Sequence, residues 1–286
     1  MGGGPILPPE LERNIFEIAS QLYPAMIPTF LCVARRVLAW TEPLLYRVVR
    51  WDGSLRSRLL LNAIISKPPA FVYNAVKSFF LEGFPVADRS LALEVLRLCT
   101  GIKNFAKFSD HTAPAMLPIL ATMCVQDLAA HLGSLFPELG AIDLTHPSFA
   151  CITHLQLLDD LDDAETRTHI CAALPVLPAL THLLLAREPP LDALRTILQE
   201  CPRLELLLIM ELHWQANFGR DYPDARVVGG TYFGHSDYWD QWEAGAAGFP
   251  NYWTRAEEFI AKKRNGEIDG AISLRVVLKC LLMTGW

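Results

Sequence analysis

The sequence predicts an α/β fold in which short parallel strands lie side by side and are joined by helices. The main observation is an apolar unit, L-x-x-L-x-L, found at Ile152–Leu157, Leu180–Leu185 and Leu204–Ile209. With weaker copies included, units begin at Val76, Ile102, Val125, Ile152, Leu180 and Leu204. The segments between them carry apolar residues at helical spacing. This period predicts a solenoid with strands on its concave face and helices on its convex face.

Composition limits the classes of partner. The chain has 286 residues, 51% of them hydrophobic, and a net charge of −6. That length allows a small domain followed by an elongated one. The acidic balance provides no global positive field, so we expect neither nucleic acid nor a membrane surface as a partner. No signal peptide is visible and no apolar stretch reaches about 18 residues, so no transmembrane helix is expected.

The seven cysteines include no C-x-x-C pair. This pattern predicts a reducing compartment, the cytoplasm and/or nucleus, without a disulfide framework. Cys99, Cys124, Cys151 and Cys201 each lie one or three residues before a unit begins. We therefore interpret them as small buried spacers between stacked repeats.

Residues 5–50 are predicted to form a separate helical unit. Pro8 and Pro9 suit the start of a helix, and apolar residues then recur at helical spacing as far as Leu22. Pro24 ends this helix, and a second helical stretch runs from Phe30 to near Pro43. Such short helices bury too little apolar surface to be stable alone, so we expect them to pack on a partner or on the next domain.

Three parts of this unit resemble an F-box. Residues 7–16 fit L-P-x-E-L-x-x-x-I-(F/L), residues 33–36 fit most of V-C-(K/R)-R, and residues 43–46 stand where that family closes with L-W. Ala34 replaces the usual cysteine and Val37 the usual tryptophan. Together with the leucine-rich repeats, the chain is similar to F-box-like proteins abundant in mushroom-forming fungi.

The resemblance implies a substrate-recognition adaptor of a cullin–RING (SCF-type) ubiquitin ligase. Its F-box would dock on the Skp-type adaptor of that ligase, and its repeats would bind a protein target that the sequence does not name. By resemblance, the docking residues are Leu7, Pro8, Leu11, Ile15, Leu31, Val33 and Arg36. The alternative is a non-catalytic leucine-rich-repeat scaffold without ligase association.

The solenoid is expected over residues 51–224. A first strand is predicted at 47–51 and a last one at 226–228. Helices are predicted at 55–65, 88–98, 113–123, 162–174 and 190–200. Lys107 and Ala130 stand where the strong repeats have leucine, so the strands around them are expected to be short or irregular.

Residues 225–265 are predicted to form an aromatic-rich C-terminal cap. Residues 232–253 contain many large aromatic side chains interrupted by glycines, and a helix is predicted at 251–264. We expect this segment to cover the apolar patch of the last two repeats; a ligand or peptide site is the alternative. The patch consists of Leu184, Leu206, Leu208 and Met210. The structure of the tail, 266–286, is left open.

Alternation along the strands places a polar row on the concave face. Asp127, His154 and His182 fall on successive strands, with His131 and Gln156 in neighbouring rows. We expect these five residues to bind the target, either exposed or hydrogen-bonded under the C-terminal segment. Two imidazoles and a carboxylate could also hold a metal, and paired histidines could make binding pH-sensitive, but we predict no metal.

No sequence motif indicates catalysis. The chain lacks a nucleophile motif, a phosphate loop, H-E-x-x-H and a dinucleotide fingerprint. We therefore predict no catalytic residues, no cofactor and no enzymatic activity. The acidic stretch 159–165 lacks the ligand spacing of a calcium loop, and we interpret it as a solvated loop before a helix N-terminus.

Overall fold

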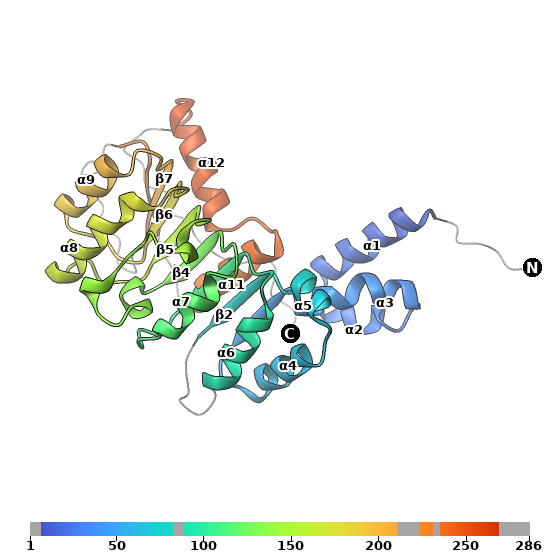
Figure 1. Ribbon diagram of the computed structural model, residues 1–286. Helices are drawn as coiled ribbons and strands as arrows, with labels where there is room; N and C mark the ends of the chain where they lie inside the picture. Colours follow the sequence, from blue (N-terminus) through green and yellow to red (C-terminus); the bar gives the residue numbers. More distant parts are fainter. Residues whose placement is uncertain (1–6, 83–88, 211–223, 231–234, 269–286) are drawn as a thin grey trace, which may run out of the picture.

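The computed structural model describes residues 7–82, 89–210, 224–230 and 235–268. Within these residues, eight parallel strands form one sheet in chain order, which gives a solenoid-like α/β fold (Figure 1). The strands are β1 (Val48–Trp51), β2 (Ser78–Leu81), β3 (Asn104–Lys107), β4 (Asp127–Ala130), β5 (His154–Leu157), β6 (His182–Leu185), β7 (Leu206–Met210) and β8 (Val227–Gly230). The tail 269–286 and the aromatic residues Tyr232 and Phe233 lie outside the described residues.

The strand register agrees with the rows predicted from the sequence. Asp127 pairs with His154, and His154 pairs with His182. The expectation of short strands at Lys107 and Ala130 is wrong, because β3 and β4 are as long as β5. The Lys107 ammonium donates hydrogen bonds to the Ser109 carbonyl oxygen and the Ser134 hydroxyl. Its stem can therefore fill a buried position that leucine occupies in other repeats.

Helices and turns cover the convex face of the sheet. They are α4 (Leu55–Ile65), α5 (Pro69–Ala75), α6 (Arg89–Leu98), α7 (Leu117–Leu120), α8 (Ala164–Ala173) and α9 (Leu191–Glu200), with short 3-10 turns between several of them. Four predicted helices are found, but the one at 113–123 is only a 3-10 turn followed by the single turn of α7. Helix α5 was not predicted. Prolines that end one helix there also begin the next.

The N-terminal helices form a unit beside the sheet. They are α1 (Pro9–Leu22), α2 (Ile27–Phe30) and α3 (Arg35–Thr41), followed by the 3-10 helix η2 (Glu42–Tyr46). Figure 1 shows α1–α3 projecting to one side of the sheet body, next to α5. Tyr46 packs edge-on against Phe71 of α5, and Lys67 Nζ lies 2.8 Å from Glu42 Oε1. The N-terminal unit therefore packs against the solenoid through η2.

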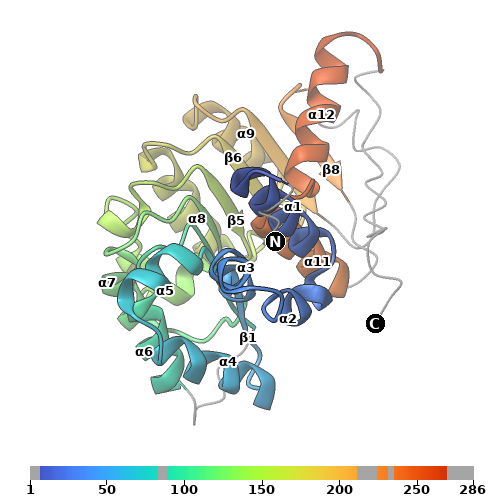
Figure 2. The same ribbon diagram turned by 90° about the vertical axis from the view of Figure 1, so that its right-hand side faces the viewer.

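Two C-terminal helices, α11 (His235–Ala247) and α12 (Tyr252–Arg264), cover the concave face. Figure 2 shows the sheet between these helices and the convex layer. A second apolar core lies beneath them, in addition to the main core under the convex helices. It contains the predicted apolar patch, so the expectation that the aromatic segment covers this patch is confirmed. The covered area is larger than predicted, because it reaches Phe80 of β2 and Val228 of β8.

The sequence does not predict helix α11, because glycines interrupt the aromatic segment. Gly245 instead lies inside α11, where a Cβ atom would come within 2.0 Å of Asn251 Nδ2. Asn251 caps α12 by accepting hydrogen bonds from the backbone N–H groups of Trp253 and Thr254. The glycine therefore allows α11 and the start of α12 to pack closely.

The cysteine prediction is corrected at two positions. Cys124 and Cys151 form a disulfide between neighbouring repeats, with Cα atoms 5.4 Å apart. Each precedes the first buried residue of its repeat, so stacking brings the two side chains together. Cys99 and Cys201 are buried free thiols, as expected of spacers.

Candidate functional site

A polar cluster lies in the middle of the concave face, beneath the C-terminal helices. Asp127, His154 and His182 begin three neighbouring strands, and Gln156 follows His154 on the same face. The expectation that this row is exposed is wrong, since Gln156 is fully buried and His182 is 8% exposed. The alternative, a row hydrogen-bonded under the C-terminal segment, is confirmed.

One part of the cluster is a hydrogen-bonded chain across three elements. The Tyr238 hydroxyl of α11 donates to Gln156 Oε1. Gln156 Nε2 in turn donates to Asp127 Oδ1 at 2.8 Å. A buried amide needs partners on both its oxygen and its nitrogen, and this arrangement supplies both. Gln156 therefore connects the sheet to α11.

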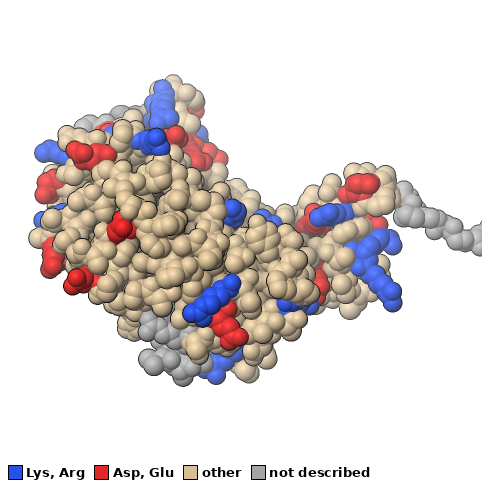
Figure 3. Space-filling view, viewed as in Figure 1, with Lys and Arg blue, Asp and Glu red and all other residues tan. Residues whose placement is uncertain are grey.

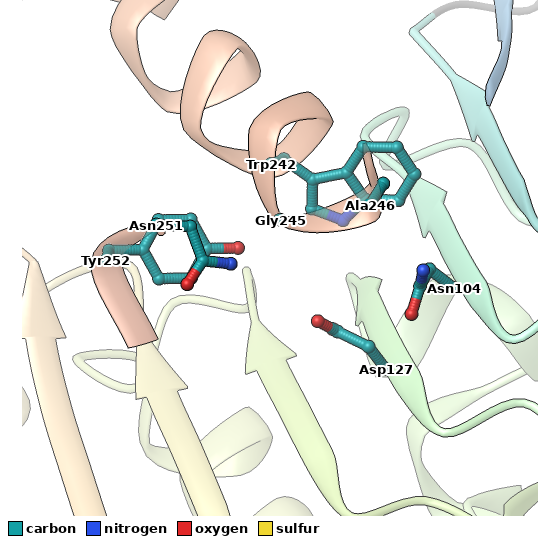
Figure 4. Close-up of a pocket in the computed structure, with 7 residues that line it drawn as sticks. All are labelled: Asn104, Asp127, Trp242, Gly245, Ala246, Asn251 and Tyr252. Atoms are coloured by element: carbon teal, nitrogen blue, oxygen red, sulfur yellow. The ribbon is translucent and has the colours of Figure 1, made fainter. Parts of the chain in front are cut away.

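A small cavity of about 60 Å³ adjoins Asp127 (Figure 4). Asn104 and Asp127 line its sheet side, and Trp242, Gly245, Ala246, Asn251 and Tyr252 line its helix side. Burial raises the pKa of Asp127 to about 7, although polar groups of Gln156 and Trp253 lower it in part. The cavity has room for a few water molecules and is far smaller than a typical ligand site of about 300–1,000 Å³.

The two histidines form the other part of the cluster. Their rings stack with centroids 4.2 Å apart, and Trp253 of α12 packs edge-on against both. Burial lowers the pKa of His154 to about 4, with His182 as a smaller cause. Burial also lowers the pKa of His182, against the opposing effect of Glu257. Sequence reasoning did not find Glu257, because it belongs to α12 and has no place in the repeat pattern.

His131 and the acidic stretch lie after β4 and β5, apart from this cluster. His131 precedes the 3-10 turn Leu132–Leu135, and burial lowers its pKa. Asp159 accepts hydrogen bonds from the backbone N–H groups of Leu132 and Gly133. It is buried, so the expectation of a solvated loop is wrong at this residue. Asp163 caps α8, because its side chain accepts a hydrogen bond from the backbone N–H of Thr166. This agrees with the expectation that acidic residues lie near a helix N-terminus.

The residues assigned to adaptor docking lie on the N-terminal unit. Leu7, Pro8, Leu11, Ile15 and Val33 are exposed, and Leu31 is half-buried. Arg36 binds Glu12 through two hydrogen bonds of 2.8 and 2.7 Å, which tie α3 to α1. Ile18 and Leu22 extend the exposed row along α1 and were not among the predicted contacts. Their spacing from Leu11 could have identified them.

Comparison of the sequence with models of known protein families gives no match, and comparison with curated proteins gives none either. Among the described helices, none combines the length and apolar character needed to cross a membrane.

Proposed function

We propose that this protein is a substrate-recognition adaptor of a cullin–RING ubiquitin ligase, with an F-box-like unit that docks on the Skp-type adaptor. The observation that carries the proposal is an exposed apolar stripe on α1. It consists of Leu11, Ile15, Ile18 and Leu22, which are 51%, 53%, 55% and 48% exposed. Apolar groups at this spacing share one face of a helix, and a contiguous apolar surface usually marks an interaction site.

The packing of the N-terminal unit supports docking by this stripe. Phe16 of α1 contacts Phe30 of α2 edge-on, with ring centroids 5.4 Å apart, and the Glu12–Arg36 pair joins α1 to α3. Internal contacts thus use other residues of α1. Because α1–α3 project from the sheet body, a partner can reach them without displacing the solenoid (Figure 1).

Surface charge favours a protein partner over nucleic acid. On the face in Figure 3, basic and acidic side chains are scattered or lie side by side, including on the projecting unit. Nucleic-acid binding would call for basic residues clustered on one face. An apolar stripe among mixed charges is more typical of a protein interface.

The proposed mechanism is proximity and requires no catalytic residue in this chain. One rigid chain would hold the target near the ubiquitin-conjugating enzyme of the ligase and so raise the effective concentration of the reacting groups. The proposal assigns no target contact to Gln156 or His182, because α11 and α12 cover them.

Binding of the full chain to a purified Skp-type adaptor tests the proposal. Replacing Leu11 and Ile15 together by alanine should weaken binding at least tenfold, since each truncation removes about 1–2 kcal/mol of apolar contact. The matched control replaces Leu55 and Leu59, which are 73% and 61% exposed on α4, and should leave affinity unchanged. Absence of binding, or equal binding by both double variants, would reject adaptor docking.

A repeat scaffold without ligase association is the second candidate. The contacts of Tyr46 with Phe71 and of Lys67 with Glu42 favour it, because they also suit an end cap for the solenoid. Repeat arrays need such caps where their cores would meet water. In that case the helices stabilise the first repeats, and the double variant of α1 has no binding phenotype.

A further inference from the structure

We propose that His154, His182 and Glu257 form a binding site for a divalent transition-metal ion of the Zn²⁺ type, which fastens α12 to the sheet. One ligand atom from each residue lies within 4.8 Å of the other two. Two imidazoles and one carboxylate are an established zinc ligand set, with water completing the tetrahedron. The proposal does not depend on ligase association.

The hydrogen bonds of the two histidines orient their ring nitrogens. Thr153 Oγ1 lies 2.9 Å from His154 Nδ1 and donates its own proton to the Gln126 carbonyl oxygen. Thr181 Oγ1 likewise lies 2.8 Å from His182 Nδ1 and donates to the Thr153 carbonyl oxygen. When each hydroxyl proton is directed to a carbonyl oxygen, each Nδ1 carries the hydrogen of its contact with threonine, and this is the tautomer that a metal ion would select.

This tautomer leaves a lone pair on each Nε2, the atom that would bind a metal. Metal-binding histidines usually donate their other N–H to a fixed acceptor, which holds the ring in place. Here that acceptor is the threonine that precedes each histidine. The Thr-His dipeptide at the start of β5 and β6 therefore supplies both the ligand and its support.

The position of Glu257 points to a cation between the three groups. Its Oε1 lies 3.1 Å from His182 Nε2, which is a hydrogen-bond distance, so in the other tautomer His182 donates its Nε2 proton to this carboxylate. That proton links the carboxylate to only one of the two rings. The stacked rings instead place two nitrogens near the same carboxylate, and a metal ion would use all three groups.

Small movements would complete the coordination. Ligands 2.0–2.1 Å from a tetrahedral zinc ion lie about 3.3 Å apart, so the three atoms must approach one another slightly. The Glu257 side chain is 51% exposed and can move, whereas Trp253 packs against both rings and restricts them. Asp127, the carboxylate suggested by the repeat pattern, is bound by Gln156 and is replaced by Glu257 in this site.

Calorimetric titration of the untagged full chain with Zn²⁺, after removal of metals by a chelator, tests the site. One ion should bind per chain, with a Kd of about 10 μM or tighter. Glu257→Gln and His154→Gln should each weaken binding at least tenfold. The matched controls are Glu258→Gln on α12 and His111→Gln, both at exposed positions, and these should bind as the wild type does.

Thermal unfolding supplies a second measurement. Zn²⁺ should raise the Tm of the wild type and of Glu258→Gln, but not that of Glu257→Gln, since a ligand stabilises the state that it binds. A Tm for Glu257→Gln equal to that of the wild type in chelator shows that this variant is folded. Failure of both Zn²⁺ and Co²⁺ to bind saturably, or unchanged binding by Glu257→Gln and His154→Gln, would overturn the proposal.

Discussion

At the scale of single residues, the molecule depends on polar groups buried under its C-terminal helices. Asp127, Gln156 and Tyr238 form a hydrogen-bonded chain, and Asp127 has a pKa raised to about 7 from an ordinary value of 3.8. The folded protein therefore holds the Asp127 proton more tightly than the unfolded chain does. Between these two pH values, stability contributed by Asp127 decreases as the pH rises.

The Asp127→Asn variant tests this linkage. With a chelator present, its stability should not decrease between pH 4 and pH 7, and at pH 8 it should exceed that of the wild type by up to about 4 kcal/mol. Urea unfolding at several pH values gives the measurement. Asp143→Asn is the control, because the exposed Asp143 has a lowered pKa, and its contribution has the opposite sign. An unchanged pH profile in Asp127→Asn would refute the assignment.

At the scale of elements, α11 and α12 act as the inner lining of the solenoid. The Trp239 ring lies 3.8 Å from that of Phe80 and 3.9 Å from that of Phe108, between centroids, and is 2% exposed. Trp239→Ala should lower the free energy of unfolding by about 3–5 kcal/mol, because it leaves a cavity against β2 and β3. Chemical denaturation measures the loss, with Leu55→Ala as the exposed control. A loss below about 1 kcal/mol would show that α11 contributes little.

Repeat elements were predictable because each has its own local pattern. Leu155, Leu183 and Leu207 hold the same position in successive repeats and pair with one another in the sheet. The sequence alone therefore predicts the strands and their register. Helix α11 could not be predicted in this way. Its Gly245 is needed for close packing against Asn251, and this contact is visible only in the folded structure. Glu257 was missed for the same reason, since its partners lie about 75–100 residues earlier in the chain.

At the scale of the whole molecule, the Cys124–Cys151 disulfide joins two middle repeats. It closes a loop of 27 residues, and its reduction should lower the free energy of unfolding by about 3 kcal/mol. The double variant Cys124→Ser, Cys151→Ser should be insensitive to reductant, whereas Cys32→Ser should respond as the wild type does. Thiol titration of denatured protein provides the direct measurement. The same thiol count before and after reduction would mean that the bond is absent.

The second core beneath α11 and α12 also has a consequence for mutational tolerance. In a solenoid with an open inner face, the residues between the leucines can change freely and diversify recognition. In this protein α11 and α12 cover the inner face. The residues buried there include Phe80, Ala129, Leu184 and Leu208, and the repeat leucines are buried on the outer face of the same strands. A saturation mutagenesis screen for folded protein should therefore find both faces of each strand equally restrictive. Tolerance should instead be greatest on the exposed side of α1, where sequence can vary without loss of the fold.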